Sequence, residues 1–458
     1  MASPSVSCPH SKLQVTVSPH AAEAGYSRRT PSQLAAAATP SGRAPGSSRT
    51  QAILLNDDDD GGSAADFAAC CPAPLVLPDD ALAVEPDSDG QSLRSWIQEK
   101  ARNAVTERRK TIYVASAPEI SDEVFIMSRW TEPLGKSRRH KVAVKPLEPE
   151  HVTDYLAAFY HGLPVKPYPG STFRFVPWEE RQTKNKKPAT VPEYVGLAIG
   201  TSVTRIRARP PPDKKFTRQL NLTDILDALI ANLPGDAYSV LLLVDHDLYE
   251  DDDDDFCCGR AYGGSRVSVV SSARYRPELD DYSGIDLGHM WPASHCASYV
   301  EEMCGVPKAK GKAKAKASPA TKGGEDADPR MKPLRAAVEA ARLAPPAEDD
   351  LYALWLSRFV RTASHELGHC LALGHCVYYA CVMQSTTGMA EDVRQPPYLC
   401  PVDMKKVTRA VLDVNKRLSE DEYLAQRDMA LFNFCGRWKQ NAMFAGYQAW
   451  LGCFLGQK

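Results

Sequence analysis

Ser-His-Glu-Leu-Gly-His-Cys-Leu-Ala-Leu-Gly-His-Cys, residues 364–376, is the most informative stretch of this chain. His365 and His369 are four residues apart, so on a helix they lie on one face, one turn from each other. Two imidazoles in that position can bind the same metal ion. Glu366 lies beside them, where a carboxylate can take a proton from a metal-activated water. The pattern is the HExxH motif of zinc hydrolases.

His375 follows His365 by ten residues and cannot lie on the same face of that helix. The helix must therefore end first, and the chain must turn back to bring a third imidazole to the metal. Three protein ligands and one open position describe a catalytic zinc rather than a structural one. Two alternatives stay open at this point: an amphipathic helix with two hydrogen-bonded histidines, and a hydrolase whose third ligand is an acid such as Glu391.

A long helix is predicted to carry this motif. Apolar side chains recur along it at helical spacing and should face the core: Leu351, Leu354, Trp355, Phe359, Ala363 and Leu367. Asp349 or Asp350 is the candidate N-cap. The helix delivers His365 and His369 at its C-terminal end, and a buried helix of about six turns is a rigid mount for a metal site.

A second group of metal-binding side chains follows the histidines. Its members are spaced as Cys-x4-Cys-x-Met and then, after sixteen residues, Cys-x2-Asp: Cys376, Cys381, Met383, Cys400 and Asp403. Three thiolates that bracket a loop and a helix start can hold a structural zinc, with Asp403 as a fourth ligand through oxygen. The alternative is three buried free cysteines, which are common in protein cores.

Several β-rich runs and one amphipathic helix precede the motif. Strands are expected at residues 111–114, 124–127, 142–144, 173–175, 194–199 and 239–245, the last of them fully buried. A helix is expected over residues 221–230, with Asn221 or Thr223 as its cap. Residues 263–272 alternate apolar and polar side chains, which is typical of a half-exposed edge strand that could pair with an extended substrate.

The composition is that of an ordinary globular protein, with 43% hydrophobic residues among 458 and a net charge of −2. A charge this small favours neither nucleic acid nor an anionic membrane as a general partner. No apolar run approaches the ~20 residues of a membrane helix, and the N-terminus has no hydrophobic signal core. Thirteen cysteines without a signal sequence indicate reduced thiols and metal binding, hence a cytoplasmic or nuclear protein. Four arginines in the first 55 residues make a mitochondrial location the alternative.

The histidine motif, the cysteines after it and the β-rich segment before it together resemble the archaemetzincins, a branch of the metzincin zinc metallopeptidases. The resemblance covers roughly residues 130–420. It implies a catalytic zinc with Glu366 as general base, and Met383 in a turn beneath the metal. The implied ligands of that zinc are His365, His369 and His375, and those of a second zinc are Cys376, Cys381 and Cys400. It also implies an α+β fold with a metzincin-like mixed β-sheet, whose edge strand lies over the cleft, and a long active-site helix. A smaller C-terminal helical subdomain completes the expected fold, and the N-terminal tail is expected to be disordered.

Three parts of the chain are expected on this basis. Residues 1–109 are low-complexity and should be disordered, because they cannot bury enough apolar surface. Residues 110–435 should form the archaemetzincin-like zinc peptidase domain, with a basic low-complexity insertion at 305–333. Residues 436–458 are an aromatic tail that either packs on the domain or binds a partner. The insertion lacks the interleaved aromatic side chains that stack on bases, so a surface loop is expected and nucleic acid is not.

Two residues depart from the family's pattern. The family has glycine seven residues after the first histidine, where this chain has Ala372, and a left-handed conformation there costs alanine about 1 kcal/mol or more. Either Ala372 adopts it or Gly374 forms the turn, which would change the approach of His375. Asp403 stands where the resemblance implies a fourth cysteine. A carboxylate also binds zinc, so this site is expected to persist with weaker affinity.

The expected function is hydrolysis of peptide bonds in a peptide or protein substrate, with one catalytic and one structural zinc. Glu366 would act as the general base. Candidates for stabilising an oxyanion are the tyrosines nearby in sequence, Tyr378, Tyr379 and Tyr398. Ala372 keeps a second interpretation open, a zinc-stabilised, non-catalytic scaffold that binds partners through a degenerate site.

Overall fold

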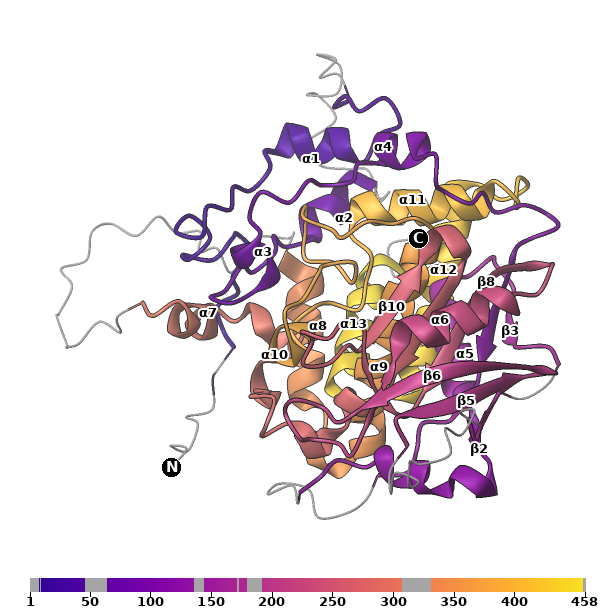
Figure 1. The fold of residues 1–458 in the computed structure, drawn as a ribbon. Helices are drawn as coiled ribbons and strands as arrows, with labels where there is room; N and C mark the ends of the chain where they lie inside the picture. Colours follow the sequence, from indigo (N-terminus) through magenta and orange to yellow (C-terminus); the bar gives the residue numbers. More distant parts are fainter. Residues whose placement is uncertain are drawn as a thin grey trace, which may run out of the picture.

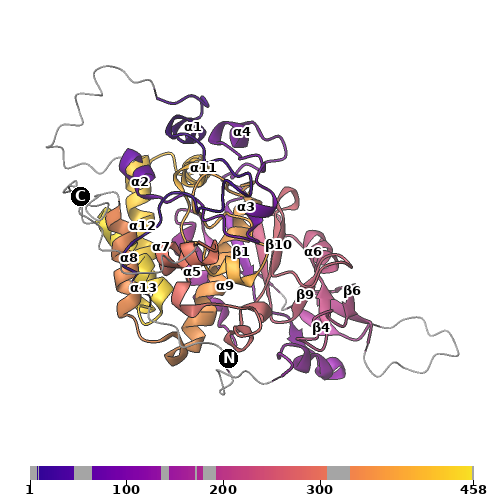
Figure 2. The same ribbon diagram turned by 90° about the vertical axis from the view of Figure 1, so that its left-hand side faces the viewer.

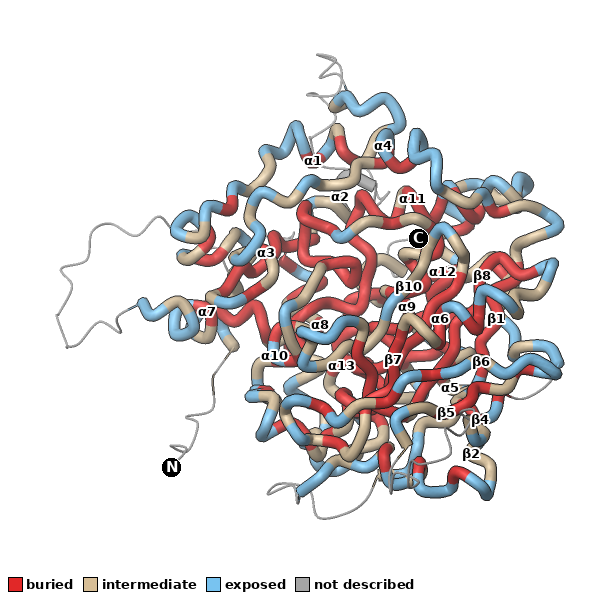
Figure 3. The backbone as a smooth tube through the Cα atoms, in the orientation of Figure 1, coloured by how far each residue is buried: buried red, intermediate tan, exposed pale blue. Residues whose placement is uncertain are grey.

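The computed structural model describes residues 8, 10–45, 64–135, 144–170, 173–178, 192–306 and 331–455. Two β-sheets and a set of helices enclose a continuous buried centre (Figures 1 and 3). The strands are β1 Thr111–Ala115, β2 Glu119–Ile120, β3 Val165–Pro167, β4 Arg174–Val176, β5 Tyr194–Ile199, β6 Ser202–Arg209, β7 Gln219–Asn221, β8 Ala237–Val244, β9 Asp247–Tyr249, β10 Gly259–Tyr262 and β11 Val267–Ser271. The α-helices are α1 Pro31–Ala37, α2 Ala64–Cys70, α3 Ala81–Val84, α4 Leu93–Gln98, α5 Pro149–Phe159, α6 Leu222–Ala231, α7 Ala297–Met303, α8 Lys332–Leu343, α9 Leu351–Cys370, α10 Met389–Asp392, α11 Pro401–Leu412, α12 Glu420–Arg437 and α13 Ala442–Leu455. No helix in these ranges is both long and apolar enough to cross a membrane.

The central sheet is mixed, with strand order β10-β11-β8-β1-β3. Neighbouring strands from β11 to β3 are parallel, and β10 pairs antiparallel with β11 at the edge. Strand β8 is buried along its whole length because both faces of the sheet are covered. Leu241 and Leu243 face the core shared with α5 and α9, whereas Val240 and Leu242 face the core shared with the second sheet.

The second sheet has strand order β2-β4-β5-β6-β7-β9 and covers the face of the central sheet opposite α9 (Figure 2). Helix α6 packs against β6 of this sheet and β11 of the central sheet, so it joins the two layers. The side chain of Asn221 caps α6 by accepting a hydrogen bond from the Asp224 amide at 3.0 Å, which confirms the expected cap.

Helix α9 runs through the middle of the molecule and is buried along most of its length. It begins at its expected cap, because the Asp350 side chain accepts a hydrogen bond from the Ala353 amide at 2.9 Å. The indole of Trp355 donates to the carbonyl oxygen of Ser272 at 2.8 Å, which ties the helix to the end of β11. The buried Arg358 guanidinium is paired with Asp280, with the closest atoms 2.6 Å apart. These contacts fix the position from which α9 presents its last turn.

The C-terminal helices form a separate helical layer on the side away from the second sheet (Figure 2). Helix α12 begins with the expected capping box of Ser419 and Glu422. The expected aromatic tail forms the end of this layer rather than an exposed arm, since α13 packs against α8 and α12. Its side chains Phe444, Tyr447 and Trp450 are buried in the main core.

The N-terminal region differs from the expected disordered tail where the structure describes it. Helix α4 lies over α11, and Trp96 is buried with its indole donating to the carbonyl oxygen of Leu371 at 2.8 Å. The Tyr26 hydroxyl donates to the carbonyl oxygen of Val377 at 2.8 Å. The region is ordered because Trp96 packs on the main body, whereas Tyr26, Val76 and Leu82 pack on one another and on Val377. Residues 1–7, 9 and 46–63 of the expected tail lie outside the described residues.

Two expectations about strands are wrong. Residues 124–127 belong to a 3-10 helical stretch, Asp122–Trp130, in which every third residue is buried and Phe125 is 66% exposed. Within residues 263–272, strand β11 is interior and fully buried, and the edge strand is β10 instead. The serines of β11 give the sequence the alternation that is typical of a half-exposed strand, but Ser271 is buried and donates to the carbonyl oxygen of His246 at 2.6 Å. Residues 142–143 of the strand expected at 142–144, and most of the basic insertion, 307–330, lie outside the described residues.

Candidate metal centre

The last turn of α9 presents His365 and His369 on one face, as their spacing requires. The helix ends in a Schellman motif, in which the Leu373 amide donates to the Gly368 carbonyl at 3.0 Å and the Ala372 amide to the His369 carbonyl at 2.9 Å. Ala372 itself takes the left-handed conformation, with φ of 60°. Alanine therefore keeps the turn that the family resemblance assigns to glycine, and Gly374 does not replace it.

This turn brings His375 back to the other two histidines. Metal-binding atoms of His365, His369 and His375 lie within 4.8 Å of one another. The ring centroid of His375 is 5.4 Å from that of His365 and 4.9 Å from that of His369. Glu391 does not take this place, because its carboxylate accepts hydrogen bonds from the backbone amides of Thr387 and Ala81. The feature that favoured a degenerate scaffold, Ala372, thus leaves the histidine triad intact.

Backbone carbonyls fix the tautomers of the two helical histidines. Nδ1 of His365 lies 2.7 Å from the carbonyl oxygen of Val382, and Nδ1 of His369 lies 2.7 Å from that of Leu373. Each Nδ1 must carry the hydrogen that it donates, so each Nε2 presents a lone pair. The two Nε2 atoms are 3.0 Å apart, an arrangement that repels without a shared cation. The donor set therefore fits a bound metal ion.

Burial keeps the three imidazoles in the neutral form that binds metals. It lowers the pKa of His365 and His375 below the usual value, and that of His369 to about 4. The neighbouring imidazoles lower the pKa of His365 and His369 further, because a second positive charge would repel the first. Metal binding thus requires no release of protons from these rings near neutral pH.

Glu366 lies next to the triad at the wall of a cleft of about 910 Å³. Burial raises the pKa of its carboxyl to about 8, and the Arg260 guanidinium opposes this shift. A divalent cation beside it would favour the ionised form. Arg260 belongs to the edge strand β10, which forms one wall of the cleft together with Tyr262. Arg260 is not among the expected site residues because the edge of the sheet was expected later in the chain, at residues 263–272.

Met383 lies under the last turn of α9, where the resemblance places a methionine. A Cβ atom added at Gly368 would lie 2.5 Å from the sulfur of Met383, so only glycine permits this approach. The three tyrosines considered for oxyanion stabilisation do not line the cleft; they are Tyr378, Tyr379 and Tyr398. Tyr262 and Tyr275 do line it. The sequence offered no signal for these two, because they come from a strand and a turn far from the motif.

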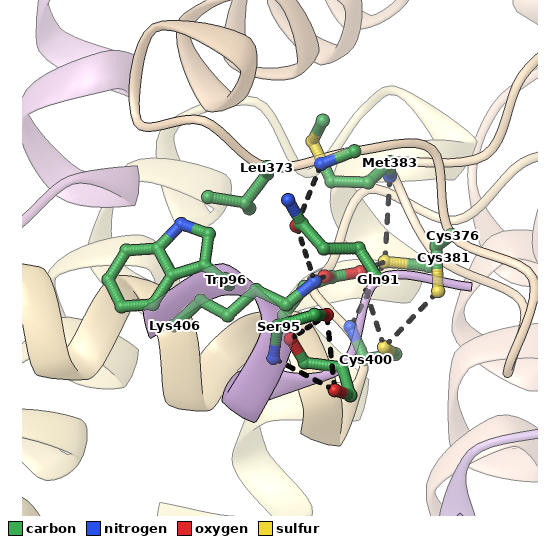
Figure 4. Close-up of polar contacts among 12 residues, drawn as sticks. Gln91, Ser95, Trp96, Leu373, Cys376, Cys381, Met383, Cys400 and Lys406 are labelled. Carbon is green, nitrogen blue, oxygen red and sulfur yellow. Dashed lines mark hydrogen bonds and ion pairs between the residues drawn. The ribbon is translucent and has the colours of Figure 1, made fainter. Parts of the chain in front are cut away.

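A second group of potential ligands lies beside the turn and is wholly buried (Figure 4). Ligand atoms of all four expected residues lie within 4.8 Å of one another, those of Cys376, Cys381, Cys400 and Asp403. The sulfurs of Cys376 and Cys400 are 3.5 Å apart, and that of Cys381 is 3.3 Å from Oδ2 of Asp403. This group has the four donors of a structural zinc site, with a carboxylate in one position.

Lys406 explains how a carboxylate fits into this group. Its Nζ lies 2.7 Å from Oδ1 of Asp403, which leaves Oδ2 facing the sulfurs. Burial and the Cys376 thiolate raise the pKa of Asp403 to about 7, and the Lys406 ammonium opposes them. Nζ of Lys406 also donates to Oε1 of Gln91 at 3.0 Å, so the N-terminal region takes part in the site (Figure 4).

Gln91 connects this second group to the first. Its Nε2 donates to the Ala372 carbonyl and its Oε1 accepts from the Gly374 amide, each at 2.9 Å. The turn that positions His375 is thus held from outside by a residue that sequence reasoning had placed in a disordered region. The only sequence signal for it is the short helix that follows, capped by Ser92.

Comparisons with known proteins agree with the site. The family model of peptidase family M54 matches residues 339–409, which include α9 and the cysteines after it. Human archaemetzincin-1 is 28% identical over 224 residues, which cover 47% of this chain and 36% of that protein. Human archaemetzincin-2 is 23% identical over 340 residues, which cover 74% of this chain and 70% of that protein.

Two solved structures are also similar to this chain. The archaemetzincin from Methanopyrus kandleri is 18% identical, with a TM-score of 0.28, and the match covers 67% of this chain and 98% of that one. The zinc-dependent peptidase from Methanocorpusculum labreanum is 16% identical, with a TM-score of 0.30 and coverage of 65% and 99%. In its motif, its site and the matches to its sequence, the chain is similar to the archaemetzincins of peptidase family M54.

Proposed function

We propose that this protein is a zinc-dependent metallopeptidase whose catalytic zinc is held by His365, His369 and His375. The observation that carries the proposal is the convergence of three neutral imidazoles at the wall of a cleft. The Nε2 atoms of two of them, His365 and His369, are 3.0 Å apart. Three protein ligands leave a position open for water or substrate, as in catalytic zinc sites.

Groups around the metal act as general base and as hydrogen-bond acceptors for the imidazoles. When bound, zinc polarises the scissile carbonyl group and makes a water molecule acidic enough to act near neutral pH. Glu366 accepts the proton of that water and later delivers it to the leaving amine. The carbonyls of Val382 and Leu373 hold the two helical imidazoles in the orientation that this chemistry needs.

The edge strand β10 supports the choice of a peptide or protein as the substrate. It lies in the cleft wall beside Glu366, and no other strand of the described residues pairs with its outer edge. An extended peptide could add to this edge and place a peptide bond over the metal. The polar groups of the cleft, among them Arg260, would contact the side chains or carbonyl groups of such a peptide.

A second, structural zinc at the cysteine group is part of the same proposal. Lys406 supplies a positive charge to a site that would otherwise hold three thiolates and a carboxylate around one zinc. We also infer that the functional unit extends beyond residues 110–435. Gln91 and Trp96 hold the turn after α9, and α13 completes the core below it.

The test is Glu366→Gln, measured by hydrolysis of a mixture of unstructured peptides and by zinc content. General bases contribute about 10²–10⁴-fold to rates, so activity should fall by at least about 100-fold while zinc is retained. Glu348→Gln, at an exposed carboxylate just before α9, is the control and should keep the parent rate. Parent-level turnover by the Glu366 variant would refute the proposed mechanism.

A further inference from the structure

A third group of metal-binding side chains lies outside both sites described above. It contains Cys8 and His10 from the N-terminal segment, and His289 and Cys296 from the 3-10 turns before α7. One ligand atom from each residue lies within 4.8 Å of those from the other three. Around a tetrahedral zinc bound by sulfur and nitrogen, neighbouring ligand atoms are about 3.3–3.8 Å apart. Small adjustments of the four side chains, among them a separation of the Cys8 and Cys296 sulfurs, which lie 3.0 Å apart, are therefore enough to bind one ion.

The two histidines of this group have nitrogens that lack partners. Nε2 of His10 and Nε2 of His289 are buried and make no hydrogen bond of good geometry among the described residues. Burial lowers the pKa of His289, but Asp286 and the nearby thiols of Cys296 and Cys8 raise it to about 10, so metal binding would displace a proton from this ring. Leaving a buried polar atom without a partner is unfavourable, and native proteins rarely do so without a ligand or ion nearby. Both unpartnered nitrogens belong to residues whose ligand atoms converge, which is what a bound cation requires.

Neighbouring side chains hold His289 in the orientation of a metal ligand. Its Nδ1 lies 2.6 Å from Oδ2 of Asp286, so a carboxylate fixes the tautomer that leaves the lone pair on Nε2. Its ring is stacked on Tyr299, with centroids 4.2 Å apart and planes 9° apart. A histidine with a carboxylate behind it is the common arrangement around protein-bound zinc.

The two cysteines are free thiols that both contact the hydroxyl of Ser298. Their sulfurs are 3.0 Å apart, which is longer than the ~2.05 Å of a disulfide bond. The Ser298 hydroxyl lies 3.2 Å from each of them. A hydroxyl in that place can donate a hydrogen bond to a thiolate and so favours the form that binds metals.

We propose that Cys8, His10, His289 and Cys296 form a structural zinc site that fastens the N-terminal segment to the body of the protein. Two thiolates and two neutral imidazoles balance the charge of a Zn²⁺ ion and occupy all four tetrahedral positions. Unlike the triad on α9, this site leaves no position for a water or substrate. Its role is therefore to hold the fold together.

The backbone beside the four ligands supports this role. Leu13 forms a β-bridge with Cys296, the Gln14 amide donates to the His295 carbonyl at 2.7 Å, and the Ala297 amide donates to the Lys12 carbonyl at 2.9 Å. Among the described residues these two hydrogen bonds are the only backbone bonds that join the two segments, and isolated pairs of this length are marginally stable in water. A metal that binds both strands at one end supplies the additional stabilisation.

The experiment compares zinc content and protease sensitivity of the full chain with those of Cys8→Ser/Cys296→Ser. The double variant should bind one zinc fewer per chain than the parent, and trypsin should cut it faster after the exposed Lys12. Cys304→Ser, at a half-buried thiol at the end of the neighbouring α7, is the matched control and should match the parent in both measurements. Should the double variant fail to fold, His10→Gln, which changes one ligand in the N-terminal segment, is measured in its place.

Equal zinc content in the parent and in the ligand variants would overturn the proposal. So would a parent protein in which two of the thirteen thiols stay unreactive after unfolding in chelator, because that result indicates a Cys8–Cys296 disulfide instead. Neither readout depends on peptidase activity, so the result for this site is independent of the result for Glu366.

Discussion

Replacement of Ala372 by glycine tests whether strain is stored in the turn that positions the third histidine. Ala372 has φ of 60°, and its Cβ is then too close to its own carbonyl oxygen, at a cost of about 1–2 kcal/mol. Glycine removes that cost but gives the unfolded chain more freedom, which offsets about 0.4–1 kcal/mol. We therefore expect Ala372→Gly to stabilise the metal-loaded protein by about 0.5–1 kcal/mol.

The assay is urea unfolding of the zinc-loaded protein, followed by the fluorescence of its tryptophans. The matched control is Ala363→Gly, at a buried position of α9 two turns before the turn. There the backbone is helical, and glycine should destabilise by about 1 kcal/mol. The two alanine-to-glycine changes should thus shift the urea midpoint in opposite directions.

Equal destabilisation by both variants would refute the reasoning, because it would mean that position 372 is not left-handed in the folded protein. Gln91→Ala should weaken the same turn, since it removes the bonds to the Ala372 carbonyl and the Gly374 amide. Its effect should be smaller in the Ala372→Gly background, where the turn no longer needs to hold alanine in an unfavourable conformation.

Two further predictions concern buried charges. Asp403→Asn should lower the zinc content by one per chain and destabilise the protein by about 3–5 kcal/mol, because the buried Lys406 loses its carboxylate partner. Asp403→Cys should keep the zinc, and unchanged metal content in the asparagine variant would contradict the ligand assignment. Burial lowers the pKa of His246 from 6.5 to about 4, so its contribution to stability is complete above pH 6.5 and is lost as the pH falls towards 4. In His246→Gln the side chain can still donate to the Met127 carbonyl but does not titrate. Between pH 7 and pH 4 the free energy of unfolding, measured in urea, should therefore fall by about 3 kcal/mol less in this variant than in the parent. Parallel pH profiles of the two proteins would contradict this.

Local patterns in the sequence were sufficient for the centre of the site. The helix that carries His365 and His369 could be predicted because its apolar spacing, its Asp350 cap and the ligand spacing agree with one another. The buried strand β8 could also be predicted, because a short continuous apolar run between turn residues is typical of a buried strand.

Contacts between distant segments could not be predicted. Gln91 is an isolated polar residue in a low-complexity stretch, and only the fold shows that it holds the turn 281 residues later. The pairing of Cys8 and His10 with His289 and Cys296 has no sequence spacing to reveal it, because the two halves are 288 residues apart. The edge strand was misplaced because buried serines in β11 resemble the polar face of an exposed strand.

The most direct test of the account is a crystal structure with anomalous diffraction data collected on both sides of the zinc absorption edge. The account predicts a zinc peak bonded to His365, His369 and His375, at distances of about 2.0–2.1 Å from each nitrogen. A metal-loaded crystal without zinc at that point, or with His375 turned away from the other two imidazoles, would contradict it.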